Sequence, residues 1–195
     1  ITWQQCNAFN VWRTQLLNSW RKNHMLSFVQ DFRLPRETEW EYAARGGLDN
    51  NPYPWGGPYI RNSRGCFLGN FKPLRGRYME DGGFHTVKAN SYHPNDFGLY
   101  CMSGNVAEWC RTAFDESVYE YGHDMNTEYI YHALDHDPPS MKRKVVRGGS
   151  WKDIGYYLQT GTRSYEYQDT AKSYIGFRSV MNYLGRGGPN KEGDF

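Results

Sequence analysis

The stretch from Arg147 to Arg163, RGGSWKDIGYYLQTGTR, has the composition of an ordered polar site, with paired glycines, charged side chains and two adjacent tyrosines. It contains no cysteine and no histidine that would support nucleophilic chemistry. Ser150, Ser164 and Ser173 offer hydroxyls, but an active serine needs a base beside it, and the last histidine in the chain is His136. The spacing therefore does not predict a serine nucleophile, although such sites are defined by geometry and not by chain order.

Two histidines, His132 and His136, have the i, i+4 spacing that would place two metal ligands on one helix face. Asp135 and Asp137 lie beside them. The surrounding segment YIYHALDHDPPS is short and ends in prolines, and it lacks the glutamate of a zinc-protease motif. We therefore predict a solvated polar loop here.

The four cysteines are Cys6, Cys66, Cys101 and Cys110, which allow three fully paired disulfide connectivities. Their spacings match no zinc signature. Because cysteine is among the most buried residue types, we interpret them as small buried side chains or as including one structural disulfide.

Composition favours one globular domain. The chain has 195 residues, 17% of them aromatic, and 21 glycines, with a mean hydropathy of −0.84, which is typical of a fold rich in turns and loops. A formal charge of +2 without a basic cluster predicts no nucleic-acid partner. No apolar run is long enough to span a bilayer, and no signal peptide or lipid-attachment sequence is present. Because the sequence begins with Ile1, we expect a fragment or processed product whose address or anchor lies upstream.

Two helices are expected near the start. Apolar residues in WQQCNAFNVWRTQLLNSW recur at close to i, i+3, i+4 spacing, which predicts an amphipathic helix whose apolar face covers a core: Cys6, Phe9, Trp12, Leu16, Leu17 and Trp20. The segment RETEWEYAARGG predicts a second helix. Pro35 precedes it, Glu37 and Glu39 lie in its first turn, and Gly46 and Gly47 end it.

Residues 48–95 lose this periodicity and are rich in turn residues, but their aromatic content predicts ordered loops. Short strands are predicted in DFRLP, FGLYCM, KVVRGGSW and IGFRSVMNYL, with a polar insert from Asp115 to Arg143. The closing GRGGPNKEGDF is predicted to be a flexible tail. The order of elements predicts a loop-rich α+β domain with two N-terminal helices and short antiparallel strands.

Five blocks, FRLPRETEWEYAARGG, YPWGG, NDFGLYCMSGNVAEWC, VVRGGSWKD and IGFRSV, carry a specific likeness. In order and approximate spacing they resemble the formylglycine-generating enzyme (sulfatase-modifying factor) domain, which is similar to a C-type lectin fold. The resemblance implies a single domain over residues 1–184, followed by the tail at residues 185–195. It also implies that an N-terminal part of the domain is missing, because Ile1 falls where the family enters its second helix.

A narrower likeness is to the gliding-motility and type IX secretion lipoproteins of the PorK/GldK kind. It is carried by PYIRNSRGCFLGNFKP, by the segment from Gly148 to Arg178 and by the closing YLGR. It implies a subunit at the periplasmic face of the bacterial outer membrane, held by an upstream lipid anchor. The expected partners are homo-oligomeric ring neighbours and a ring partner protein of the PorN/GldN kind.

Catalytic members of the family use two cysteines that bind copper and oxidise a substrate cysteine, and soft thiolates suit Cu(I). Counted from the Gly-Gly-Ser-aromatic block, the matching positions fall near Leu158 and Arg163, and counting back from Gly176-Phe177-Arg178 moves them by a few residues. No cysteine follows Cys110, so no alignment of this region restores the pair. We therefore expect a pseudoenzyme that has no catalytic residues and uses no copper.

The family often holds structural calcium, for which oxygen atoms are the preferred ligands. The resemblance implies a first site at Asn70, the carbonyl of Phe71, Asp81 and a carbonyl at Gly83. It implies a weaker second site at Gly104, Val106 and Glu108, where Cys101 replaces an oxygen ligand. The alternative for Asn70 and Asp81 is ordinary turn capping.

Three arginines in the matched blocks, Arg147, Arg163 and Arg178, lie among glycines and aromatic residues. A planar guanidinium can bond several loop carbonyls or carboxylates at once. We predict that these arginines brace irregular backbone, with candidate counterions at Glu41, Glu108 and Asp153.

Three functions remain in competition. The leading hypothesis is a non-catalytic structural subunit of the type IX secretion and gliding apparatus, forming a ring with a partner. The alternatives are an oxidoreductase of the formylglycine-generating type and a lectin-like module that binds glycan or peptide through tryptophan and tyrosine.

Overall fold

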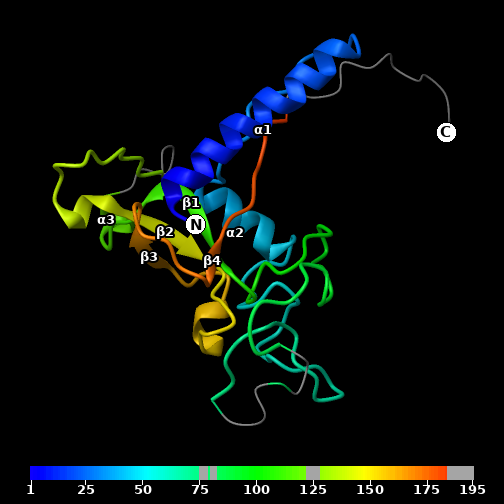
Figure 1. The fold of residues 1–195 in the computed structure, drawn as a ribbon. Helices are drawn as coiled ribbons and strands as arrows, with labels where there is room; N and C mark the ends of the chain where they lie inside the picture. The colour runs from blue at the N-terminus through cyan, green and yellow to red at the C-terminus, as the bar shows by residue number, and fades with distance from the viewer. Residues whose placement is uncertain (75–78, 80–82, 122–127, 184–195) are drawn as a thin grey trace.

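The computed structural model describes residues 1–74, 79, 83–121 and 128–183 (Figure 1). Its centre is a four-stranded sheet with strand order β3–β2–β1–β4. β1 (Ala107–Ala113) pairs antiparallel with β2 (Arg143–Arg147), and β2 pairs antiparallel with β3 (Ser164–Tyr167). β4 (Ile175–Gly176) pairs with β1 in parallel. The expectation of antiparallel strands is therefore wrong for β4, and the domain is α+β with a mixed sheet.

Both predicted helices are present. α1 (Trp3–Asn23) begins with a capping box, in which the Gln5 backbone donates to the Thr2 hydroxyl and the Thr2 backbone donates to the Gln5 side chain. α2 (Glu37–Arg45) ends at Gly46, whose φ of +60° is the left-handed conformation that glycine adopts without strain. The end signals read from the sequence of α2 are thus confirmed.

The sheet lies between these two helices. Successive side chains of a strand point to opposite faces, so each face of the sheet can pack against a different helix. Trp109 and Val146 pack in one cluster with Trp3 and Cys6 of α1. On the other face, Cys110 and Val145 pack with residues of α2: Trp40 and Ala44. These two buried clusters form the core, with the first turns of α1 on one side of the sheet and α2 on the other.

The apolar face predicted for the first helix covers the core only in part. Cys6 is fully buried, but four of the predicted core residues are exposed: Phe9, Trp12, Leu16 and Trp20. The buried residues in the following turns are instead polar. Asn10 accepts a hydrogen bond from Ser179, and Thr14 accepts one from the backbone of Phe32, which offsets part of the cost of burying them. Among the described residues, the buried Asn10 Nδ2 has no hydrogen-bond partner.

The strand predictions are mixed. KVVRGGSW contains β2, whereas FGLYCM contains no strand, because Gly98 and Cys101 adopt positive φ angles that break extended backbone. The strand that was not predicted, β1, begins five residues after this segment. IGFRSVMNYL begins with β4, which confirms a strand there in part. DFRLP forms no strand and pairs with the middle of that segment by a single bridge, in which Arg33 and Val180 exchange backbone hydrogen bonds.

In the described part of residues 48–95, the backbone forms turns and one bridge, between Arg61 and Phe67, as the loop prediction requires. A third cluster orders these loops, with Tyr53, Phe67 and Phe71 packed around Leu158. The polar insert carries α3 (Val118–Tyr121) and a 3-10 turn, η1 (Pro139–Lys142). A second 3-10 turn, η2, spans Gly155–Leu158.

Among the described residues, no helix is long and apolar enough to cross a bilayer. The predicted tail at residues 185–195 lies outside the described residues. The extent of the domain and its likeness to a C-type lectin stay predictions.

Candidate functional site

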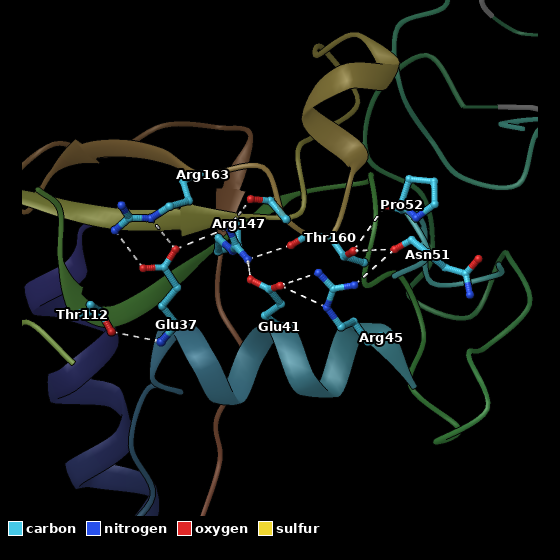
Figure 2. Close-up of polar contacts among 10 residues, drawn as sticks. Glu37, Glu41, Arg45, Asn51, Pro52, Thr112, Arg147, Thr160 and Arg163 are labelled. Atoms are coloured by element: carbon cyan, nitrogen blue, oxygen red, sulfur yellow. Dashed lines mark hydrogen bonds and ion pairs between the residues drawn. The ribbon is translucent and has the colours of Figure 1, made fainter. Parts of the chain in front are cut away.

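The predicted polar stretch encloses a buried ion network at its two arginines (Figure 2). Arg147 has no exposed surface, and its Nη2 donates to the Glu41 carboxylate and, at 2.7 Å, to the Thr160 carbonyl. Its Nη1 donates to the Gly161 carbonyl at 3.1 Å and lies 3.4 Å from Glu37 Oε1. Because Glu37 and Glu41 are one helical turn apart on α2, both carboxylates face this one guanidinium.

Arg163 completes the network. Its Nε and Nη2 donate to the two oxygens of Glu37 at 2.7 and 2.9 Å, and its Nη1 donates to the Asp115 carbonyl at 2.9 Å. The backbone N–H of Glu37 donates to Thr112 on β1, and Arg45 donates to Glu41 at 2.6 Å. The bracing predicted for the arginines is confirmed, but the sequence analysis missed Glu37 as a counterion. No local sequence pattern identifies Glu37 as a counterion, because its partner Arg163 is 126 positions away in the chain.

The third arginine, Arg178, belongs to a separate set of buried polar contacts. Arg178 donates to both oxygens of Glu108, at 2.5 and 2.7 Å, and Glu108 also accepts from the Trp40 indole at 2.7 Å. Asp153 is not a counterion of these arginines. It accepts from the Ser150 hydroxyl at 2.6 Å and from Lys152 at 2.9 Å, which fixes the turn after Gly149.

The positions expected for the family's thiols are occupied by structural side chains. Leu158 is fully buried in the cluster of loop aromatics, and its carbonyl accepts from Ser103 at 2.5 Å. Arg163 is held by Glu37. Ser150 and Ser164 also have structural partners, since Ser164 donates to the Val146 carbonyl at 2.8 Å. None of these contacts activates a nucleophile, so the stretch has the organisation of scaffold.

Beside this scaffold lies an open cleft of about 360 Å³. Its polar and aromatic lining includes Lys152, Asp153, Tyr157, Ser164, Tyr165, Glu166 and Tyr174. Lys152 Nζ lies 4.0 Å from the Tyr174 ring centroid. Partial burial is the largest single effect on Lys152 and opposes its charge, but the hydrogen bond and the negative charge of Asp153, with the nearby Tyr174 and Tyr157, together outweigh it, and the pKa of Lys152 is raised. Tyrosine rings with paired charges suit binding of a polar ligand more than chemistry on it.

The two histidines lie in an exposed loop, as predicted, and His136 Nε2 lies 3.9 Å from Asp137 Oδ1. All four cysteines are free thiols. Burial raises the pKa of Cys110 well above its ordinary value and that of Cys6 to about 12. Neither thiol is therefore a ready source of thiolate.

The structure brings part of the first predicted calcium site together. Asn70 is buried, and its Nδ2 donates to the His85 carbonyl at 2.6 Å, while a Cβ built on Gly83 would lie 2.5 Å from its Oδ1. The Asn70 oxygen therefore faces Gly83, which is compatible with an oxygen-ligand site. Phe71 is buried beside it, and Asp81 lies outside the described residues.

The second predicted calcium site does not fit a cation. Both oxygens of Glu108 bond to Arg178, whose positive charge would repel calcium. Gly104 packs against the Asn70 carbonyl, whereas Val106 packs against Gly176, and the Cys101 thiol donates to the Ala89 carbonyl. Within the described ranges, His, Cys, Asp and Glu side chains form no group of three that could hold a metal ion.

Comparison with known proteins gives one family match over nearly the whole chain. Residues 1–183 match the family model described as the sulfatase-modifying factor enzyme 1-like domain. The chain is 33% identical over 185 residues to inactive C-alpha-formylglycine-generating enzyme 2 of Bos taurus, covering 91% of this chain and 48% of the relative. It is 34% identical over 152 residues to the formylglycine-generating enzyme of Streptomyces coelicolor, covering 75% and 45%.

Among solved structures, PvdO from Pseudomonas aeruginosa has a TM-score of 0.67 at 21% identity, over 92% of this chain and 59% of that one. This likeness shows the fold alone. The chain spans about half the length of the curated relatives it matches.

Proposed function

Because the chain belongs to the sulfatase-modifying factor enzyme 1-like domain family, we propose that it is a non-catalytic member with a structural role. One observation carries this proposal. Where the family's thiol pair is expected, Leu158 is enclosed in an apolar cluster and Arg163 is bound to Glu37. A Cu(I) site needs soft ligands, and neither side chain supplies one.

The cysteines elsewhere in the chain support the same conclusion. The last of them, Cys110, is fully buried on β1, and burial holds it in the thiol form. A family member named inactive, from Bos taurus, is a precedent for this fold without the family's chemistry.

The structural role we propose is that of a subunit of the type IX secretion and gliding apparatus. The support is the likeness of PYIRNSRGCFLGNFKP and of residues 148–178 to lipoproteins of the PorK/GldK kind. In this proposal the protein is tied by a lipid to the periplasmic face of the outer membrane. It forms a ring with like neighbours and with a partner of the PorN/GldN kind.

Two experiments test the proposal. The protein is incubated with copper, oxygen, reductant and a cysteine-bearing sulfatase peptide, with the Streptomyces coelicolor formylglycine-generating enzyme as the positive control. We expect no formylglycine above background by mass spectrometry, and turnover would refute the non-catalytic role.

In the second experiment, the protein is mixed with the ring partner and viewed by electron microscopy. Rings that contain both proteins would support the proposed assembly, and the absence of such rings would contradict it.

A second candidate function, binding of glycan or peptide, is favoured by the cleft beside the polar stretch. Tyrosine rings offer flat faces to sugar C–H groups, and Lys152 and Glu166 flank them. A glycan array followed by the variants Tyr157→Ala and Tyr174→Ala tests this function. A hit that both variants abolish would favour it, whereas an array without a hit, or a hit that survives both changes, would reject it.

A further inference from the structure

The segment 128–133 of the polar insert, which we name the strap, lies within the described residues and forms neither helix nor strand. Its carbonyl groups are nevertheless tied to the sheet at alternate residues. The Tyr129 carbonyl accepts from the backbone N–H of Ala113, at the end of β1, at 2.9 Å. The Ala133 carbonyl accepts from the Gln168 side chain, just after β3, at 2.9 Å. Because β2 lies between β1 and β3, the strap crosses one end of the sheet.

The middle tie of the strap comes from a buried charge. The Tyr131 carbonyl accepts a hydrogen bond from Nζ of Lys144 on β2, a residue without exposed surface. This Nζ also lies 4.4 Å from the Trp3 ring centroid. Glu166 is opposite Lys144 on β3, but its carboxylate lies 3.7 Å from Lys172. The Lys144 ammonium is thus held by a carbonyl and a ring, which offset only part of the cost of burying a charge.

A second buried charge lies at the first residue of the strap. Only 7% of the Glu128 side chain is exposed, and its Oε2 lies 2.8 Å from Arg36 Nε. Its Oε1 is buried and has no hydrogen-bond partner among the described residues. Burial raises the pKa of Glu128, although three nearby arginines act against it: Arg36, Arg111 and Arg33. The charge of Glu39 adds to the rise. The closed strap therefore disfavours the charged form of this carboxyl group.

Of the described ionisable groups around Lys144, none is paired with its ammonium. On the strap, the Tyr131 hydroxyl donates to Asp137 at 2.9 Å, and the exposed His132 ring lies 6.1 Å from that of the tryptophan, centroid to centroid. On α1, Cys6 stays a thiol, because burial raises its pKa to about 12. Burial alone accounts for the lowered pKa of Lys144, about 8.

Lifting the strap would return both buried charges to water, so its closure depends on pH. From about 8 to 10.5 the open form keeps a proton on Lys144 that the closed form has lost, and closure becomes more favourable as the pH rises. Glu128 acts in the opposite sense. Its pKa is raised in the closed form, so closure becomes less favourable as the pH rises through its titration. Closure is thus weakest between these two ranges, where both groups are charged.

We propose that the strap opens as a unit from the folded sheet, and that its two buried charges, Glu128 and Lys144, make this opening easiest near neutral pH. The strap gives no residue to the three buried clusters of the core, so its opening leaves them intact. Segments with few buried apolar contacts open at a free energy below that of global unfolding. The inference concerns a moving part of the fold and does not depend on the proposed structural role.

Limited proteolysis of the purified protein tests the proposal. At about pH 7.5, chymotrypsin should cut the folded protein after Tyr129 and Tyr131, at a rate that follows the population of the open form. Lys144→Met and Glu128→Gln each remove a buried charge, so each should slow these cuts, Lys144→Met by at least about tenfold. From about pH 7.5 to about pH 9, opening of the wild type should fall roughly eightfold, with rates normalised to an unstructured peptide of the same sequence. Lys144→Met should abolish this fall.

His132→Gln is the matched control, because His132 lies on the strap but is exposed, and its cutting rate should stay within about twofold of the wild type. Cuts after Trp109, in the buried part of β1, report global unfolding, and cuts in the strap should be faster and less dependent on urea. Faster strap cuts in Lys144→Met or Glu128→Gln would show that the charges anchor the strap and would overturn the proposal. So would equal urea dependence at both places, or cuts after Trp109 without cuts in the strap. If Lys144→Met does not fold, Glu128→Gln and the pH dependence of the wild type decide the outcome.

Discussion

Arg163 and Glu37, 126 positions apart in the chain, are joined by two hydrogen bonds of 2.7 and 2.9 Å, which tie the start of β3 to the first turn of α2. The fully buried Arg147 lies against the same carboxylate and also binds Glu41, so Glu37 contacts two guanidinium groups and shares one of them with Glu41. Arg163 also stands at one of the two positions where the resemblance places the family's thiols. We expect that breaking this buried network by removing one partner destabilises the fold.

The substitution Glu37→Gln should lower the free energy of unfolding by about 3–5 kcal/mol, because it leaves two guanidinium groups short of negative charge in a buried place. Urea unfolding measures the change. Glu116→Gln is the control, since the Glu116 side chain is 74% exposed and lies 3.3 Å from Arg143. It should cost less than about 1 kcal/mol. Equal losses would show that the buried network contributes no more than a surface pair.

The substitution Gly149→Ala should be severely destabilising. Gly149 has φ of +65°, and an added Cβ would lie 2.7 Å from the Tyr157 carbonyl oxygen, so strain and steric overlap add together. Gly98→Ala is the matched control, with φ of +76° and open space around the added atom. It should cost only about 1 kcal/mol. Thermal unfolding compares them, and similar melting temperatures would mean that the turn can shift freely.

Stability should depend on pH through Lys144. This residue is fully buried, its Nζ donates to the Tyr131 carbonyl, and burial lowers its pKa from 10.5 to about 8. Between those values the unfolded chain keeps a proton that the folded protein has released, so the free energy of unfolding rises with pH. Lys144→Met removes this contribution. Urea unfolding from pH 8 to 10.5 should therefore show a steeper rise for the wild type, and equal slopes would contradict the assignment.

Calcium should raise the melting temperature through the first predicted site only. At a calcium concentration 100 times the dissociation constant, binding contributes about 2.7 kcal/mol. Asn70→Ala should abolish the calcium-dependent increment. Glu108→Gln should lower the starting stability, because Arg178 loses its partner, but should keep the increment. Loss of the increment in Glu108→Gln and its survival in Asn70→Ala would place calcium at the second site instead.

The parts of the fold that could be predicted are those with local causes. α2 carries its own start and stop signals, β2 has adjacent valines, and the three arginines are recognisable by their glycine-rich and aromatic surroundings. β1 was missed because AEWCRTA lacks a simple alternation of polar and apolar residues, and Glu108 is tolerated inside only because Arg178 and Trp40 bond to it.

Periodicity also could not decide which side of α1 meets the core. The residues that do so include Asn10 and Thr14, whose burial depends on hydrogen bonds to Ser179 and Phe32. These partners are set by tertiary structure and leave no local trace. The same is true of Glu37 in the ion network, and of the parallel pairing of β4 with β1.

The hydrogen bond from Ser179 to Asn10 joins residues 169 positions apart, and Arg33 and Val180 exchange backbone hydrogen bonds over a similar span. Contacts of such high sequence separation make folding slow, since a long loop must close before they form. α1 is synthesised before the segment that contains Ser179, yet its buried polar side chain Asn10 finds this partner only once that segment has left the ribosome. The docking of α1 is therefore expected to be a late folding event of this domain.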